Sequence, residues 1–110
     1  MATPEGRVKE MVKRALKEEF DRRYLFMPVQ NGMGAPALDL YNCIDGLFVA
    51  IETKAPGKTM TPRQLMTAKD IADAGGLVFE VSCAAHMVAA IDVINLTLTY
   101  RKPRDPVESP

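Results

Sequence analysis

Hydrophobic residues recur at helical spacing in three parts of the chain, and two of these parts carry a clear start signal. Thr3 and Thr61 are each followed by a proline, and threonine as N-cap with proline at the first helical position is a favoured helix start. Gln64, three residues after Thr61, completes a capping box. The pattern predicts helices over residues 3–23, 61–75 and 84–98.

The remaining apolar runs have the length and composition of strands. They cover residues 24–30, 38–44, 47–52 and 77–82, and a Gly-rich loop occupies residues 31–36. Pro28 is expected to make the first strand irregular, because proline donates no backbone hydrogen bond. The strand at 47–52 is apolar on both faces, so we expect it inside the sheet. The last strand follows a crossover helix and is expected to run parallel to a neighbour, which predicts a mixed sheet flanked by helices.

Asp45-Gly46 separates the second and third strands, and Asp-Gly between two apolar runs is a strong signal for a two-residue hairpin. Such a turn pairs Ile44 with Leu47 and, by the same register, places Asp39 directly opposite Glu52. Directly opposed residues point to one face, with Cβ atoms about 5 Å apart. The hairpin therefore predicts that two carboxylates meet at the end of a buried strand.

Two opposed carboxylates repel each other, and a divalent cation between them would remove that repulsion. Lys54 lies two residues after Glu52 and shares its face. The alternative is that Asp39 and Glu52 are two acids on a solvated strand face. Because an acid and a lysine at the end of a buried strand are unusual, the pattern favours a metal site with a lysine beside it.

The length and composition of the chain limit the class of protein and the kind of metal site that it can form. A chain of 110 residues with 47% hydrophobic residues is expected to form one domain over residues 1–100, with a charged, proline-rich, disordered tail at 101–110. The single histidine, His86, disfavours a multi-histidine zinc site. No apolar run reaches the roughly 18 residues of a membrane span. We therefore expect a soluble, cytoplasmic protein with no membrane partner.

The net charge of zero argues against general adhesion to nucleic acid, but the distribution of charge is uneven. Basic residues gather around the predicted site, where they could contact a phosphate backbone or form a solvated surface; these residues are Lys54, Lys58, Arg63 and Lys69.

At this point the residues resemble a known family. Asp39 followed by Glu52-Thr53-Lys54 resembles the PD-(D/E)xK nuclease signature, although two residues separate Pro36 from Asp39 where the family has none. Longer stretches, at residues 34–39, 46–57, 61–64 and 74–76, resemble the VRR-NUC (virus-type replication-repair nuclease) family, and residues 3–9 look like the start of small phage-encoded members. The resemblance implies an α/β protein with a restriction-endonuclease-like αβββαβ core.

The same resemblance implies a Mg²⁺- or Mn²⁺-dependent DNA endonuclease. Stand-alone members of this size resemble homodimeric Holliday-junction resolvases, which implies branched, four-way DNA as the partner in a phage-infected or bacterial cell. Asp39, Glu52 and the backbone carbonyl of Thr53 are the implied metal ligands, and Lys54 is the implied group that orients water or stabilises charge on the phosphate.

Two further site residues have competing interpretations. Glu5 is a candidate third acid, but an acid in the first turn of a helix also complements the helix dipole. Gln64 corresponds to a glutamine at the family's active site and also completes the capping box, so we expect both roles. Lys58, Arg63 and Lys69 are expected phosphate contacts.

Other functions stay open at this stage. A monomeric flap or nicking nuclease would use the same residues. A catalytically silent nucleic-acid-binding module would keep the fold without turnover, and in a small α/β interaction protein the acids would be incidental.

Overall fold

The computed structural model describes residues 2–30 and 34–101. Residues 31–33, which are the first half of the predicted Gly-rich loop, and residues 102–110 of the predicted tail lie outside the described residues. The elements, in chain order, are α1 (Pro4–Glu19), β1 (Arg23–Phe26), β2 (Leu40–Ile44), β3 (Leu47–Thr53), α2 (Pro62–Asp73), β4 (Leu77–Val81) and α3 (Ala84–Tyr100). The predicted αβββαβ order, followed by a third helix, is confirmed.

The two predicted helix starts are present. The side chain of Thr3 accepts a hydrogen bond from the Gly6 amide, and Thr61 and Gln64 form the complete capping box. The predicted end of the first helix at Arg23 is wrong, because α1 stops at Glu19. Arg23 is needed as the first residue of β1, where it pairs with Ile44, so the chain must reverse before it. Sheet pairing here outweighs local helix propensity.

The sheet has the order β1-β2-β3-β4, with antiparallel pairs except for the parallel pair of β3 and β4. Asp45 and Gly46 have positive φ angles of 48° and 85°, as a type I′ turn requires. The turn pairs Ile44 with Leu47, as predicted. β1 is shorter than predicted and ends at Phe26, two residues before Pro28.

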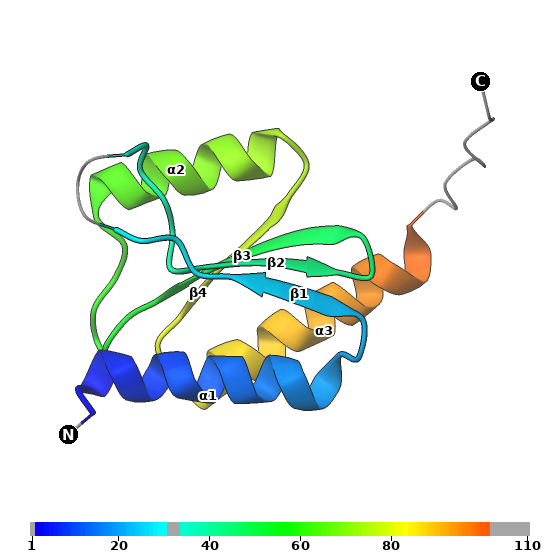
Figure 1. Ribbon diagram of the computed structural model, residues 1–110, viewed down its shortest axis with the longest axis horizontal. Coiled ribbons are helices and arrows are strands. Elements are labelled where there is room, and N and C mark those ends of the chain that lie inside the picture. The colour runs from blue at the N-terminus through cyan, green and yellow to red at the C-terminus, as the bar shows by residue number, and fades with distance from the viewer. Residues whose placement is uncertain (1, 31–33, 102–110) are drawn as a thin grey trace.

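The helices cover the two faces of the sheet unequally. Figure 1 shows α1 and α3 below the sheet and α2 above it. The apolar core lies on the side of α1 and α3, where Val12, Val49, Ile51 and Ile94 are fully buried. On the other side, no residue of α2 is buried. β3 lies between β2 and β4 and is an interior strand, as predicted. α2 covers the second face of the sheet less completely than α1 and α3 cover the first.

None of the helices in residues 2–30 and 34–101 is both long enough and apolar enough to cross a bilayer.

Candidate active site

A cleft of about 580 Å³ opens at the end of the sheet where β2 begins and β3 ends. The beginnings of α1 and α2 lie on either side of this end of the sheet (Figure 1). The cleft brings together the five residues that the sequence predicted as catalytic, which are Glu5, Asp39, Glu52, Lys54 and Gln64. Segments that are up to about 60 residues apart in the chain therefore share one polar cleft.

Asp39 and Glu52 meet just beyond the last regular pair of the hairpin, Leu40 with Ile51. The backbone N–H of Asp39 donates a hydrogen bond of 3.0 Å to Glu52 Oε1. In return, Asp39 Oδ2 accepts hydrogen bonds from the Thr53 backbone N–H, at 3.1 Å, and from its hydroxyl, at 2.7 Å. The two acids are thus joined by hydrogen bonds across the end of the hairpin.

Glu52 is almost completely buried, with 2% of its surface exposed. Burial, together with the negative charge of Asp39, raises the pKa of its carboxyl from the ordinary 4.5 to about 7. The hydrogen bond from the Asp39 backbone and the charge of Lys54 oppose this rise. At neutral pH without a cation, Glu52 therefore exists in both protonation states.

Lys54 and Gln64 are the side chains that contact the second oxygen of Glu52. Lys54 Nζ lies 3.5 Å from Glu52 Oε2, and the lysine side chain is 13% exposed. Gln64 Nε2 donates a hydrogen bond of 2.7 Å to the same oxygen, while Gln64 Oε1 accepts one of 3.0 Å from the Thr61 backbone. One amide therefore caps α2, as predicted, and also contacts the buried acid of the cleft.

Two cleft residues were missed by the sequence interpretation. Gln30 Nε2 donates a hydrogen bond of 3.2 Å to Asp39 Oδ1, and Lys9 Nζ lies 3.8 Å from the same oxygen. Lys9 follows Glu5 by four residues and so shares its helix face, a signal that could have identified it. Gln30 follows the irregular segment at Pro28 and carries no periodic signal.

The other predicted site residues lie farther from the acid pair. Glu5 is exposed on the wall of the cleft, and no set of three or more histidine, cysteine, aspartate or glutamate side chains in the described ranges is grouped to hold a metal. Lys58 is exposed in the turn after β3, and Lys69 is exposed and forms an ion pair of 2.5 Å with Asp73. Arg63 lines a second cavity that adjoins the cleft.

The donor set fits a hard divalent cation. Asp39 and Glu52 offer carboxylate oxygens, and Mg²⁺ commonly uses one or two carboxylates together with water and substrate phosphate oxygens. A positive charge beside Glu52 would also favour its ionised form, which burial disfavours. The residues therefore suit an open two-carboxylate site that water and substrate complete.

Comparison with protein-family models gives no match, and no curated protein matches the chain. A solved structure described as a "VRR_NUC domain" matches with a TM-score of 0.63 and 20% sequence identity, over 92% of this chain and 100% of the other. The chain has the fold of a VRR_NUC domain. The predicted restriction-endonuclease-like core and the resemblance to VRR-NUC proteins are thus confirmed at the level of the fold.

The buried acid in this VRR_NUC fold leads to a prediction about stability and pH. Because the folded state raises the pKa of Glu52, it binds a proton more tightly than the unfolded chain does. This contribution to stability is complete below pH 4.5 and is lost as the pH rises to about 7. At about 1.4 kcal/mol per pKa unit, the loss is about 3 kcal/mol. Glu52→Gln, which cannot ionise, should gain stability relative to the wild type over this pH range.

Denaturant unfolding between pH 4 and pH 8, in the presence of a chelator, measures this difference. Glu10→Gln is the control, because Glu10 is an exposed acid that pairs with Lys13. Its difference from the wild type should stay small across the same range. If the stability difference between Glu52→Gln and the wild type does not change with pH, the carboxyl is not perturbed as described.

Proposed function

We propose that the protein is a Mg²⁺- or Mn²⁺-dependent endodeoxyribonuclease of the VRR-NUC type. This proposal rests on the buried Glu52 carboxylate, which accepts a hydrogen bond from Asp39 and forms an ion pair with Lys54. These residues lie at the open end of a VRR_NUC fold. Such a constellation is costly for folding, because it buries an acid next to a second acid. A catalytic role explains why the chain maintains it.

In this proposal, Asp39, Glu52 and the backbone carbonyl of Thr53 hold the cation. When bound, the cation supplies Lewis-acid polarisation of the phosphodiester and lowers the pKa of a water molecule. Lys54 presents its ammonium group beside the same acids, where it stabilises negative charge that develops on the phosphate oxygens.

The surrounding residues position these groups. Gln64 orients the Glu52 carboxylate through its amide, and Gln30 does the same for Asp39. Lys9 balances the charge of Asp39 from α1. Glu5 acts from the mouth of the cleft, where its exposure suits contact through water.

Lys58, Arg63 and Lys69 are proposed contacts to phosphates on either side of the cut. All three are exposed, and exposed basic side chains can bind a DNA backbone without a large cost of desolvation. Lys69 must first leave Asp73, so we expect it to contribute least.

We further propose that the substrate is branched DNA, such as a four-way junction, and that the active form is a homodimer. Each chain carries one acid pair, whereas resolution of a junction requires two cuts, which a two-fold axis supplies. The exposed aromatic residues of β1 support this state. Tyr24 and Phe26 are 69% and 53% exposed, and burial against a second copy would remove this apolar surface from water.

The first prediction from this proposal concerns catalysis. Asp39→Asn, Glu52→Gln and Lys54→Ala should each lower the cleavage rate by about 100-fold or more, as expected when one transition-state contact is removed. Gel assays with labelled junctions, flaps and duplexes in Mg²⁺ or Mn²⁺ measure the rate. Lys13→Ala is the control for lost charge, because Lys13 pairs with Glu10 outside the cleft.

Wild-type rates in any of the three variants would refute the site assignment. DNA binding without cleavage in either cation, for the wild-type protein, would instead identify a catalytically silent binding module.

The second prediction concerns cation binding without DNA. Because Mg²⁺ or Mn²⁺ would bind the folded site alone, the free energy of unfolding should rise by about 2.7 kcal/mol at 100 times the dissociation constant. The increase should be larger at pH 8 than at pH 6, since the cation requires the ionised form of Glu52. Thermal melts at constant ionic strength measure it.

Asp39→Asn is the decisive variant in these melts, because it removes the negative charge of one proposed ligand while keeping the shape of the side chain. Its melting temperature should no longer respond to the cation. An equal response in the wild type and in the variant would place the cation elsewhere.

The third prediction concerns assembly. Light scattering at micromolar concentration should give about twice the chain mass of 12.1 kDa. Phe26→Glu should convert the protein to a monomer and abolish paired incisions, because it places a charge in the apolar surface of β1. A monomeric wild type that prefers flaps to four-way junctions would favour the flap-nuclease alternative.

A further inference from the structure

A second cavity, of about 270 Å³, adjoins the cleft between α2 and the segment that leads into β2. Gln30 and Gln64 line both spaces, and each donates a hydrogen bond to one acid of the cleft, Gln30 to Asp39 and Gln64 to Glu52. The cavity, which we name the flanking pocket, is therefore separated from the acid pair by only two amide side chains.

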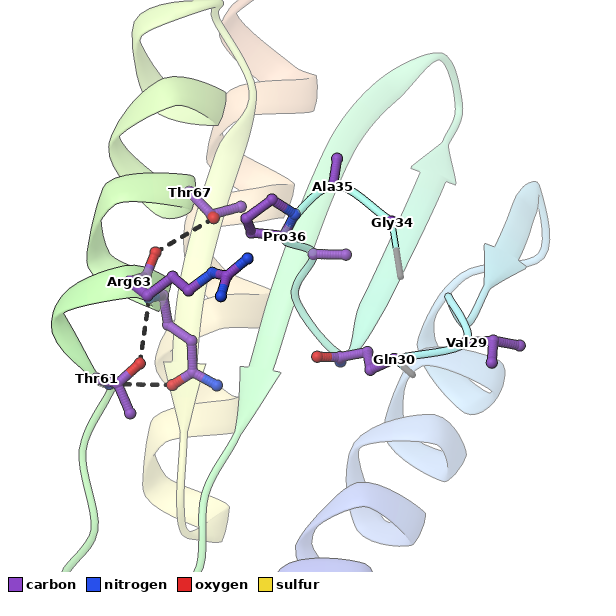
Figure 2. A pocket seen from close by; sticks show the side chains of 10 residues that line it. Val29, Gln30, Gly34, Ala35, Pro36, Thr61, Arg63 and Thr67 are labelled. Carbon is purple, nitrogen blue, oxygen red and sulfur yellow. Dashed lines mark hydrogen bonds between the residues drawn. The ribbon is translucent and has the colours of Figure 1, made fainter. Parts of the chain in front are cut away.

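The flanking pocket has one apolar wall and one polar wall. The apolar wall is formed by Val29, Ala35 and Pro36, and Val29 is 86% exposed. The polar wall is formed by Arg63 and Thr67 of α2, and Figure 2 shows the Arg63 side chain extending from α2 toward Pro36. Walls of this kind suit a ligand that has a flat apolar body and polar edges.

The guanidinium of Arg63 is available for a ligand. Within residues 2–30 and 34–101 it has no carboxylate partner and donates no hydrogen bond, whereas Lys69 on the same helix is paired with Asp73. Within the same ranges, the one side-chain hydrogen bond that involves Arg63 is accepted by its carbonyl oxygen, from the Thr67 hydroxyl at 3.3 Å. An unpaired guanidinium can stack on a nucleobase or bind a phosphate.

We propose that the flanking pocket receives one unpaired nucleotide immediately beside the phosphate that the cleft binds. This inference rests on the proposed nuclease function. The volume is slightly below the roughly 300–1,000 Å³ of typical small-ligand pockets, so it suits one base and not a base pair. Arg63 stacks on the base with the face of its guanidinium, and the N–H edge of the same group keeps the phosphate contact proposed above. Pro36 and Val29 contact the other surfaces of the base.

A nucleotide in this pocket must leave the stack of a duplex, which costs least at a branch point or in a single strand. The flanking pocket thereby selects substrates by their strand structure and reads no particular sequence, because stacking on a guanidinium tolerates every base.

The experiment compares base removal in the substrate with Arg63 variants in the protein. The cut is first mapped on an unmodified flap or junction. Two modified substrates are then made, each with one abasic nucleotide, on one or the other side of the cut. Fluorescence anisotropy, with Ca²⁺ in place of Mg²⁺, measures affinity. In the wild type, an abasic nucleotide on one side only should weaken binding by about tenfold, the effect expected from loss of one base-stacking contact.

In Arg63→Ala, the same replacement should change affinity by less than about twofold, because the stacking partner is already absent. Arg63→Lys keeps the positive charge but has no planar group to stack on the base. It should therefore recover only part of the affinity for unmodified DNA and remain insensitive to the abasic site. Arg14→Ala is the matched control, since Arg14 is an exposed helical arginine that lines neither cavity. It should keep the full abasic penalty.

An abasic penalty of equal size in the wild type and in Arg63→Ala would overturn the flanking pocket while leaving the nuclease proposal in place. A wild type that cuts branched DNA with no abasic penalty on either side would overturn it as well. A wild-type protein that neither binds nor cuts any of these substrates would refute the proposed function, and the pocket proposal with it.

Discussion

The register of the β2–β3 hairpin is the constraint on which the site depends. The turn at Asp45 and Gly46 uses positive φ angles at both positions, and Arg22 and Arg101 each form an ion pair with the Asp45 carboxylate. A slip of one residue would transfer every side chain of β3 to the opposite face. Glu52 would then point into the apolar core between the sheet and the helices α1 and α3. A two-residue turn thus decides whether the acid faces the cleft or the core.

The buried carboxylate of Glu52 is stabilised by groups from several elements. The Asp39 backbone and the Gln64 amide donate to its two oxygens, and Lys54 supplies a positive charge. These contacts satisfy its hydrogen bonds, yet burial still raises its pKa to about 7. The fold therefore keeps an acid that is poised near neutrality, where a cation or a proton can change its charge. A buried acid with a raised pKa lowers stability, and such a cost is expected at a site where function and stability compete.

The unequal cover of the sheet explains where the open surfaces lie. α2 packs on β4 and buries none of its own residues, so the same face of the sheet stays open over β1 and β2. Tyr24 and Phe26 are exposed there, and the flanking pocket opens beside the start of α2. The thin layer formed by α2 thus leaves an exposed apolar surface on β1 and an open pocket beside α2, whereas α1 and α3 supply the core on the other face.

The sequence by itself determined the features that depend on neighbouring residues. The helix starts at Thr3 and Thr61, the Asp45-Gly46 turn and the pairing that brings Asp39 to Glu52 follow from local rules of capping, turn geometry and strand alternation. The early end of α1 and the approach of Lys9 and Gln30 to Asp39 were decided only by the tertiary structure. The exposed place of Glu5 and the flanking pocket were decided in the same way. These features depend on how elements far apart in the chain pack together, and no local pattern encodes the positions at which separate helices and loops meet a sheet.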